Sequence, residues 1–274
     1  MSPVTVNGAA IHYSDQGPAD GPPVVLVHGH PFNRTLWAPQ AEALGAAGYR
    51  VVTPDLRGYG ESAVVPGKTL LSDFADDIAG VLDHLGLRRA VIGGVSMGGQ
   101  IAMAFQQAYA PRVRALVLSD TSPVAETEEG KAFRSGLADR LLAEGMDGYA
   151  DEVIDKMLAP YNVAAMPDVA ELVLTMMRTT APEGAAAALR GRAERPDYRE
   201  TLAGVRTPTL IVVGADDVYT PVADAEAMLG LMPRAVLAVI DDAGHLPGVE
   251  QPERFNEALL KFLGTHVASD DSDA

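Results

Sequence analysis

A serine flanked by two glycines is the residue in this chain that is best suited to nucleophilic chemistry. Gly94, Ser96 and Gly98 form a Gly-x-Ser-x-Gly pentapeptide that ends one apolar run and opens a helix-like stretch. A serine between a strand and a helix lies in a tight, strained turn that exposes its hydroxyl group, and nearby glycines keep Cβ atoms out of that turn. The same pentapeptide also occurs by chance in loops, so the role of Ser96 depends on what else the chain offers.

Two later segments offer the partners that a serine nucleophile needs. A serine hydroxyl requires a base, and an imidazole with an ordinary pKa of about 6.5 suits proton transfer at neutral pH. His245 follows an apolar run over residues 235–240, and Asp216 and Asp217 end another run that starts at residue 209. Either aspartate could orient the imidazole. The order serine, acid, histidine is that of a triad assembled from successive strand ends of one parallel sheet.

The elements that must position these residues alternate between strand and helix. Residues 4–6 and 11–13, on either side of an Asn-Gly pair, predict an opening hairpin. Short apolar runs predict strands at 24–27, 51–53, 90–93, 115–118, 210–213 and 235–240. Helices are predicted at 37–47, 70–85, 99–109, 223–231 and 252–262. This alternation predicts an α/β fold class, with a mostly parallel central sheet flanked by helices.

One long segment interrupts the alternation. Residues 122–204 contain no predicted strand, and helical patterns recur at 127–144, 149–158, 168–178 and 184–192. We interpret this segment as an all-helical cap insertion over the carboxyl edge of the sheet, where sites of α/β proteins open. The predicted organisation is a core in two parts over 1–121 and 205–266, a helical cap over 122–204, and a disordered acidic tail over 267–274.

Composition limits the classes of function. The 274 residues are 47% hydrophobic, which suits one compact unit with an insertion. The absence of cysteine excludes disulfides, thiolate metal ligands and a cysteine nucleophile. A formal charge of −16 disfavours nucleic acid as a partner, and no apolar run reaches membrane length. With no signal-like N-terminus, we expect a cytoplasmic protein without a membrane partner and leave homo-oligomer formation open.

Five short motifs follow one another along the chain. They are the loop at 28–31, an Asp-x-Arg-Gly-x-Gly-x-Ser turn at 55–62, the serine turn at 94–98, the acid turn at 214–221 and the histidine turn at 244–255. Together they resemble the α/β-hydrolase fold superfamily, in its helical-cap branch of serine esterases, lactonases and cofactor-free haloperoxidase-like enzymes. The resemblance extends to about residue 262. Residues 195–209 resemble sequences called 3-oxoadipate enol-lactonase-like hydrolases, a label that covers esterases with many substrates.

The resemblance implies a role for each site residue. Ser96 is the nucleophile, His245 the base and Asp217 the acid, while the backbone N–H groups of His30 and Met97 form the oxyanion hole. It implies neither a cofactor nor a metal. A metal site built on the two histidines of the 28–31 loop is disfavoured, because no further histidine-rich motif accompanies them.

The choice of Asp217 over Asp216 also comes from the resemblance. The acid of the family falls three residues after the glycine that ends the strand and four before a proline. Counted from Gly214 and Pro221, that position is Asp217. Asp216 is then left to cap the turn or to face solvent.

Several activities fit such a triad. The first is hydrolysis of a carboxylic ester or lactone through an acyl-Ser96 intermediate, and the alternatives are perhydrolysis with peroxide and C–C bond hydrolysis. A serine at position 96 excludes the dehalogenases and epoxide hydrolases of this fold, which need a carboxylate nucleophile. A non-catalytic binding protein is disfavoured because serine, acid and histidine are all present.

The charge of the chain suggests the type of substrate. An anionic substrate approaching a protein of charge −16 is repelled unless a local arginine offsets the field. Near the motifs the candidates are few, since Arg34 lies beside the 28–31 loop and Arg57 serves its own turn in the family. Cap arginines such as Arg140, Arg178 and Arg190 lie on predicted helices whose facing the sequence does not give. We therefore expect a small, neutral and apolar substrate.

Overall fold

A seven-stranded sheet forms the centre of the protein. The structure, a computed structural model, describes residues 3–267. The strand order is β3-β5-β4-β6-β7-β8-β9, with β3 antiparallel to β5 and the other neighbours parallel. The strands are β3 (Tyr13–Gln16), β4 (Pro23–Val27), β5 (Arg50–Pro54), β6 (Ala90–Val95), β7 (Val113–Ser119), β8 (Thr209–Gly214) and β9 (Ala235–Ile240). The predicted fold class is confirmed.

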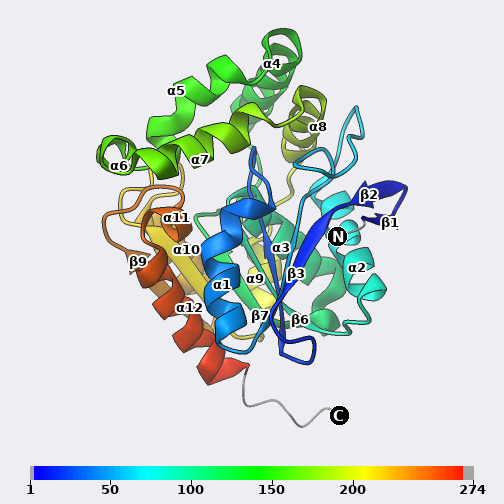
Figure 1. Cartoon of the computed structure of the whole chain (residues 1–274), viewed down its shortest axis with the longest axis vertical. Coiled ribbons are helices and arrows are strands. Elements are labelled where there is room, and N and C mark those ends of the chain that lie inside the picture. The colour runs from blue at the N-terminus through cyan, green and yellow to red at the C-terminus, as the bar shows by residue number, and fades with distance from the viewer. Residues whose placement is uncertain (1–2, 268–274) are drawn as a thin grey trace.

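Helices cover both faces of this sheet because its inner strands are apolar on both sides. In β4, Val25 and Val27 join one hydrophobic core, whereas Val24 and Leu26 join the other. The first face is covered by α2 (Leu71–His84), α3 (Met97–Tyr109), α9 (Arg199–Gly204) and α10 (Val222–Leu231). The second is covered by α1 (Ala38–Ala46), α11 (Pro247–Glu250) and α12 (Pro252–His266). Figure 1 shows α2 and α3 on one side of the sheet and α1 and α12 on the other.

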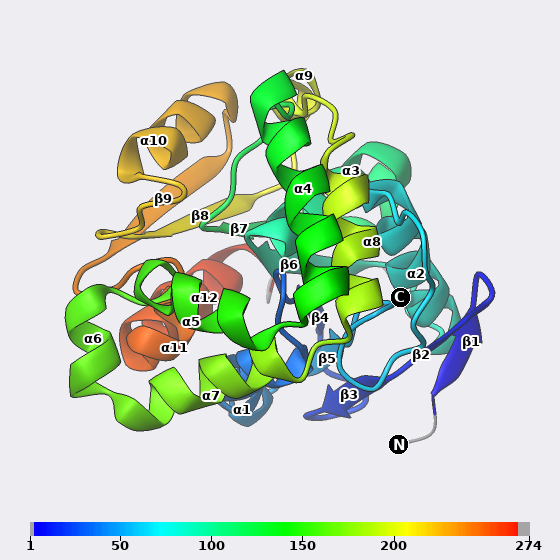
Figure 2. The ribbon, with the colours of Figure 1, turned by 90° about the horizontal axis from the view of Figure 1, so that it is seen from above.

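Five helices lie together at one end of the sheet (Figure 1). They are α4 (Glu128–Glu144), α5 (Asp147–Met157), α6 (Pro160–Ala165), α7 (Pro167–Arg178) and α8 (Pro182–Arg192), and we call them the helical layer. Figure 2, the view from above, shows α4 alongside α8. Among the described residues, those between β7 and β8 form no strand. Helix α9, at the end of the predicted insertion, packs instead against α3 and α10.

The helix α8 lies very close to the core. A Cβ atom on Gly184 would lie 2.0 Å from the carbonyl oxygen of Gly58, and one on Gly191 would lie 1.6 Å from that of Thr69. The backbone N–H of Thr69 donates to the Ala187 carbonyl at 3.0 Å. The two glycines, seven residues apart, therefore allow one side of α8 to touch the loops that follow β5.

The opening hairpin differs from the prediction in its second strand. Strand β1 (Val4–Val6) pairs antiparallel with β2 (Ala9–Ile11), and the two form a separate small sheet. A two-residue turn of Asn7 and Gly8, both with positive φ, places Ala9 opposite Val6. The predicted strand at 11–13 crosses the boundary between β2 and β3. The short helices α6, α9 and α11 were also not predicted, because four to six residues carry too little periodicity.

The end of the chain is described as far as Val267. This residue is buried, and its N–H donates to the Leu263 carbonyl at 2.8 Å. The rest of the predicted tail over 267–274 lies outside the described residues. Two short 3-10 helices, η1 (Arg34–Trp37) and η2 (Ala110–Arg112), complete the elements. Within residues 3–267, no helix has both the length and the apolar character that crossing a membrane requires.

Candidate active site

Ser96 lies in a strained turn between β6 and α3. Its φ of 56° and ψ of −116° are unusual for a residue with a side chain. A Cβ atom on Gly94 would lie 2.3 Å from the backbone of Gly98, and one on Gly98 would lie 2.1 Å from the carbonyl oxygen of Val27. Both flanking positions thus exclude any larger residue, and the turn holds Ser96 at the carboxyl end of β6.

Asp217 and His245 come together from the ends of β8 and β9. The Nδ1 atom of His245 lies 2.8 Å from an Oδ atom of Asp217, and both side chains are buried. Asp217 also accepts hydrogen bonds from the Tyr219 backbone N–H at 2.8 Å and from the Thr220 hydroxyl. Burial alone would raise the pKa of Asp217, but His245 and these hydrogen bonds lower it. The carboxylate is therefore ionised at neutral pH and able to orient the imidazole.

The neighbouring Asp216 lies elsewhere. It is exposed, and it accepts a hydrogen bond of 2.5 Å from the hydroxyl of Tyr161 in α6. The structure thus places Asp217, and not Asp216, against His245.

Ser96 and His245 both line one pocket of about 960 Å³ between the sheet and the helical layer. Among the described residues, no hydrogen bond joins the Ser96 hydroxyl to His245. Such bonds are often absent before substrate binds and form in the complex. The pocket is lined on its other side by residues of α4, α5 and α8.

The backbone N–H groups of Met97 and His30 are available as donors at this site. Met97 is the first residue of α3, and within residues 3–267 neither its N–H nor that of His30 has a hydrogen-bond acceptor. A helix N-terminus favours negative charge, so the N–H of Met97 suits an oxyanion. The His30 side chain also lines the pocket, and its Nδ1 pairs with the Tyr59 hydroxyl at 2.8 Å. Burial lowers the pKa of His30, so its ring is neutral.

His28 holds the loop that carries His30. Its Nδ1 lies 2.8 Å from the Gly29 carbonyl oxygen, and its Nε2 accepts the Leu56 N–H at 3.0 Å. Both ring nitrogens are therefore used within the protein. The two histidines of this loop serve different contacts and do not point to a shared metal.

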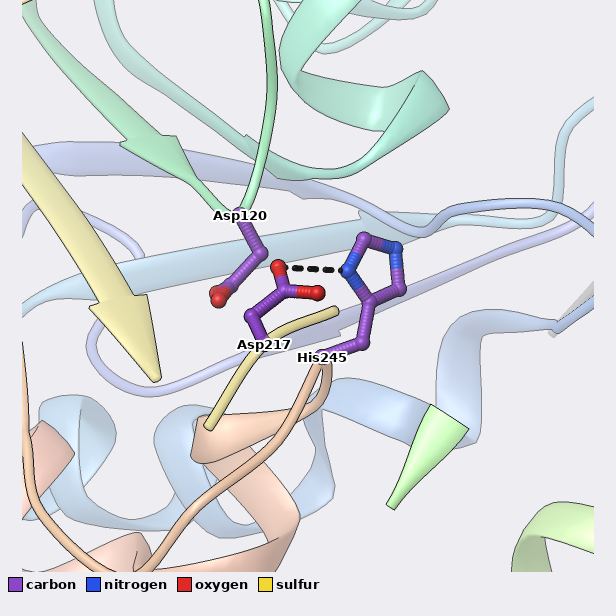
Figure 3. Close-up of side chains that lie close together, drawn as sticks. All are labelled: Asp120, Asp217 and His245. Atoms are coloured by element: carbon purple, nitrogen blue, oxygen red, sulfur yellow. Dashed lines mark hydrogen bonds and ion pairs between the residues drawn. The ribbon is translucent and has the colours of Figure 1, made fainter. Parts of the chain in front are cut away.

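Asp120 is a third buried acid at the site, and the sequence did not lead us to expect it. Figure 3 shows Asp120, Asp217 and His245 converging from three neighbouring strand ends. Their side-chain oxygen and nitrogen atoms lie within 4.8 Å of one another. Asp120 accepts the Gly214 N–H at 2.8 Å and the Ser119 hydroxyl at 2.5 Å. The sequence signal for Asp120 is its position directly after the apolar run of β7, because residues that follow parallel strands meet at one edge of the sheet.

The protonation of Asp120 differs from that of Asp217. Burial and the adjacent Asp217 raise the pKa of Asp120 well above the ordinary range of an aspartic acid. Two carboxylates this close do not both ionise readily, so Asp120 stays neutral while Asp217 carries the charge. The arrangement leaves a single negative charge beside His245.

Glu250 joins the histidine loop to the helical layer. One oxygen accepts the Gly244 N–H at 2.8 Å, and the other accepts the Ala159 N–H and the Asn162 side chain, each at 2.8 Å. Ala159 and Asn162 belong to the start of α6, and Gly244 directly precedes His245. One buried carboxylate thus fixes the position of the His245 loop relative to α6.

Basic side chains of the helical layer and the segment after it line the pocket. The lining contains five basic residues, Arg134, Arg140, Lys156, Arg192 and Arg195, against three acids, Asp120, Glu152 and Asp224. Arg34 and Arg57 lie outside this lining and pair with acids of their own. The expectation of a neutral, apolar substrate rested on a pocket poor in basic side chains. Of the three arginines named from the sequence, Arg140 lines the pocket, whereas Arg178 and Arg190 pair with acids outside the lining. The other basic residues of the lining remove that ground.

Comparison with known proteins supports the same interpretation of the chain. The model of the α/β hydrolase fold family matches residues 22–252. A thermophilic esterase from Thermogutta terrifontis, solved with malate bound, is 41% identical with a TM-score of 0.92 over 97% of both chains. The 3-oxoadipate enol-lactonase 1 of Acinetobacter baylyi is 30% identical over 93% of this chain and 94% of its own. A 2-hydroxy-6-oxononadienedioate/2-hydroxy-6-oxononatrienedioate hydrolase of Burkholderia vietnamiensis is 33% identical over 92% and 90%.

These relatives are named as an esterase, a lactonase and a hydrolase, and the family model covers well over half of the chain. The resemblance inferred from the five sequence motifs is therefore confirmed. This protein is a hydrolase that belongs to the α/β hydrolase fold family.

Proposed function

We propose that the protein cleaves a carboxylic ester or lactone of a small molecule through an acyl-enzyme on Ser96. The observation that carries the proposal is the buried Asp217–His245 pair, with its 2.8 Å contact, in the same pocket as the strained serine. Asp217 holds the proton of the neutral ring on Nδ1, which leaves Nε2 free to take the Ser96 proton. The positive charge that His245 then acquires is stabilised by Asp217, which is already ionised.

The proposed reaction has two halves. Ser96 attacks the carbonyl carbon while His245 accepts its proton, and the N–H groups of Met97 and His30 donate to the oxyanion. His245 returns the proton to the leaving oxygen, and the acyl group stays on Ser96. Water then attacks the acyl carbon with His245 again as base, which releases the acid and restores the serine.

We further propose that the helical layer is a cap that forms the roof of the pocket and selects the substrate. Residues of α4, α5 and α8 line the pocket opposite Ser96, which supports this role. Cytoplasmic location and homo-oligomer formation stay predictions from the sequence.

The test compares wild type with Ser96→Ala on nitrophenyl esters of short and medium acyl chains and on γ- and δ-lactones. Loss of the triad nucleophile lowers turnover by about 10⁶-fold in enzymes of this type, so we expect Ser96→Ala to be inactive. A normal circular dichroism spectrum of the variant is the control for folding. Substantial hydrolysis by folded Ser96→Ala would refute the serine mechanism. Peroxide added to acetate assays separates perhydrolysis from hydrolysis.

A further inference from the structure

Arg192 is a buried cation at the last residue of α8. Its exposed fraction is 9%, and it lines the pocket that holds Ser96 and His245. Its Nε donates a side-chain hydrogen bond to the Gln100 Oε1 at 3.2 Å. Within residues 3–267 no carboxylate forms an ion pair with it. The C-terminal end of the α8 dipole offsets part of the Arg192 charge. Among the described residues, however, neither Nη atom of Arg192 has a hydrogen-bond acceptor.

The other arginines of the pocket already have acids. Glu126 accepts a hydrogen bond from Arg134 and lies 3.8 Å from Arg195. Arg140 makes two hydrogen bonds to Glu152, at 3.0 and 2.7 Å. Glu126 thus serves two of these arginines, and Glu152 serves the third. Arg192 differs because it is more buried than Arg134 or Arg140 and lacks such a partner among the described residues.

The buried position of Arg192 lowers the pKa of its guanidinium. Burial, together with Arg134 and Arg195, lowers the pKa of Arg192 to about 9. The guanidinium is still charged at neutral pH. Burial of a charge without a partner is expensive, and an anion that entered the pocket would offset this cost.

Gln100 fixes the guanidinium relative to the nucleophile. Gln100 is buried in the first turns of α3, four residues after Ser96. Four residues of helix correspond to an axial rise of about 6 Å. Arg192 is therefore bonded to the first turns of the helix that starts directly after Ser96, and Ser96, Gln100 and Arg192 all line the same pocket.

We propose that Arg192, oriented by Gln100, binds a carboxylate carried by the substrate, at a short distance from the ester or lactone carbonyl that Ser96 attacks. This substrate class, a half-ester or lactone of a dicarboxylic acid, rests on the proposed function. A carboxylate matches the two free terminal nitrogens of a guanidinium in the bidentate geometry that both groups favour. The net charge of −16 acts on the approach of the substrate, whereas Arg192 acts in the pocket, where solvent screening is weak.

The test uses two esters that differ only in a terminal carboxylate, 4-nitrophenyl hydrogen glutarate and 4-nitrophenyl pentanoate, with the enzyme-free rates subtracted. Arg192→Gln should lower kcat/KM for the glutarate ester by about 10- to 100-fold and for the pentanoate ester by less than about threefold. Arg192→Lys should restore part of the loss. The matched control is Arg190→Gln, which removes an arginine of the same helix that pairs with Asp139 outside the pocket lining, and it should leave the ratio between the two esters unchanged.

An equal loss on both esters would show that Arg192 only supports the structure, and no loss on either would also overturn the proposal. A second measurement separates the subsite from the chemistry. Calorimetric titration of Ser96→Ala with glutarate, and with succinate and adipate as neighbouring lengths, should show binding that Arg192→Gln abolishes. If the wild-type enzyme cleaves neither ester but a dicarboxylate binds in a manner that depends on Arg192, the proposed function is wrong and the proposed anion site is supported. If no dicarboxylate binds, the anion site fails.

Discussion

Replacement of Asp217 by asparagine tests how the triad works. The Asp217 side chain is fully buried, and its contact to His245 Nδ1 is 2.8 Å. Asparagine keeps the size and can still accept from the Tyr219 N–H, but its amide group donates toward His245. The imidazole then turns to the tautomer with its proton on Nε2, where it cannot take the proton of Ser96.

The expected magnitude distinguishes this effect from loss of a hydrogen bond alone. Removing one charged hydrogen bond costs about 1.5–3 kcal/mol, which corresponds to roughly 10- to 150-fold. The wrong tautomer costs about 10⁴-fold, or about 5.4 kcal/mol of barrier. We therefore expect Asp217→Asn to lose about four orders of magnitude in kcat, with an unchanged circular dichroism spectrum.

The matched control is Asp216→Asn, one residue away. Asp216 is exposed and bonded to Tyr161, so its change should alter kcat by less than about threefold. The assay is steady-state hydrolysis of a neutral nitrophenyl ester between pH 6 and 9. A larger loss in Asp216→Asn than in Asp217→Asn would refute the assignment. A loss of only about tenfold in Asp217→Asn would show that the neighbouring Asp120 takes over as the acid.

Two further predictions concern stability. Gly98→Ala places a Cβ atom 2.1 Å from the Val27 carbonyl oxygen and should lower both activity and melting temperature, whereas Gly136→Ala, in open space on α4, should raise stability by about 0.5–1 kcal/mol. A more stable, fully active Gly98→Ala would contradict the strained turn. The raised pKa of Asp120 means that the folded state holds a proton that the unfolded state releases above about pH 4, so stability falls as pH rises from there. Thermal unfolding at pH 5 and 8 should show a smaller drop in Asp120→Asn than in wild type, and equal drops would show that Asp120 is ionised.

The strand ends could be predicted from the sequence because their residues report a local constraint. The glycines around Ser96 have no space for a side chain, and apolar runs of five or six residues mark buried parallel strands. Strand ends of one parallel sheet meet at one edge, so serine, acid and histidine could be placed together from the sequence alone. Asp120 lies at a strand end of the same sheet, but it could not be predicted as a site residue because a triad needs only one acid.

The lining of the pocket could not be predicted in this way. Helix α8 is buried on nearly all sides, with a run of alanines from Ala185 to Ala188, and so carries no polar and apolar faces that would give its orientation. Arg190, a candidate from the sequence, lies outward and pairs with Asp139, whereas Arg192, which was not a candidate, lies inward. Which arginine faces the pocket depends on how α8 packs against α4 and the core, and that is set by contacts between distant segments.

The Glu250 carboxylate has a practical consequence for the design of chimaeras. Exchange of the helical layer for that of a relative would be an obvious way to change substrate range. Two of the donors to Glu250, Ala159 and Asn162, would leave with α6, while Gly244 would stay. Burying the Glu250 carboxylate without these donors would cost several kcal/mol of stability, and the loop that carries His245 would lose its fixed position. A productive graft therefore keeps the native chain through Asn162 and exchanges only α7 and α8, or else replaces Glu250 and both donors as one set.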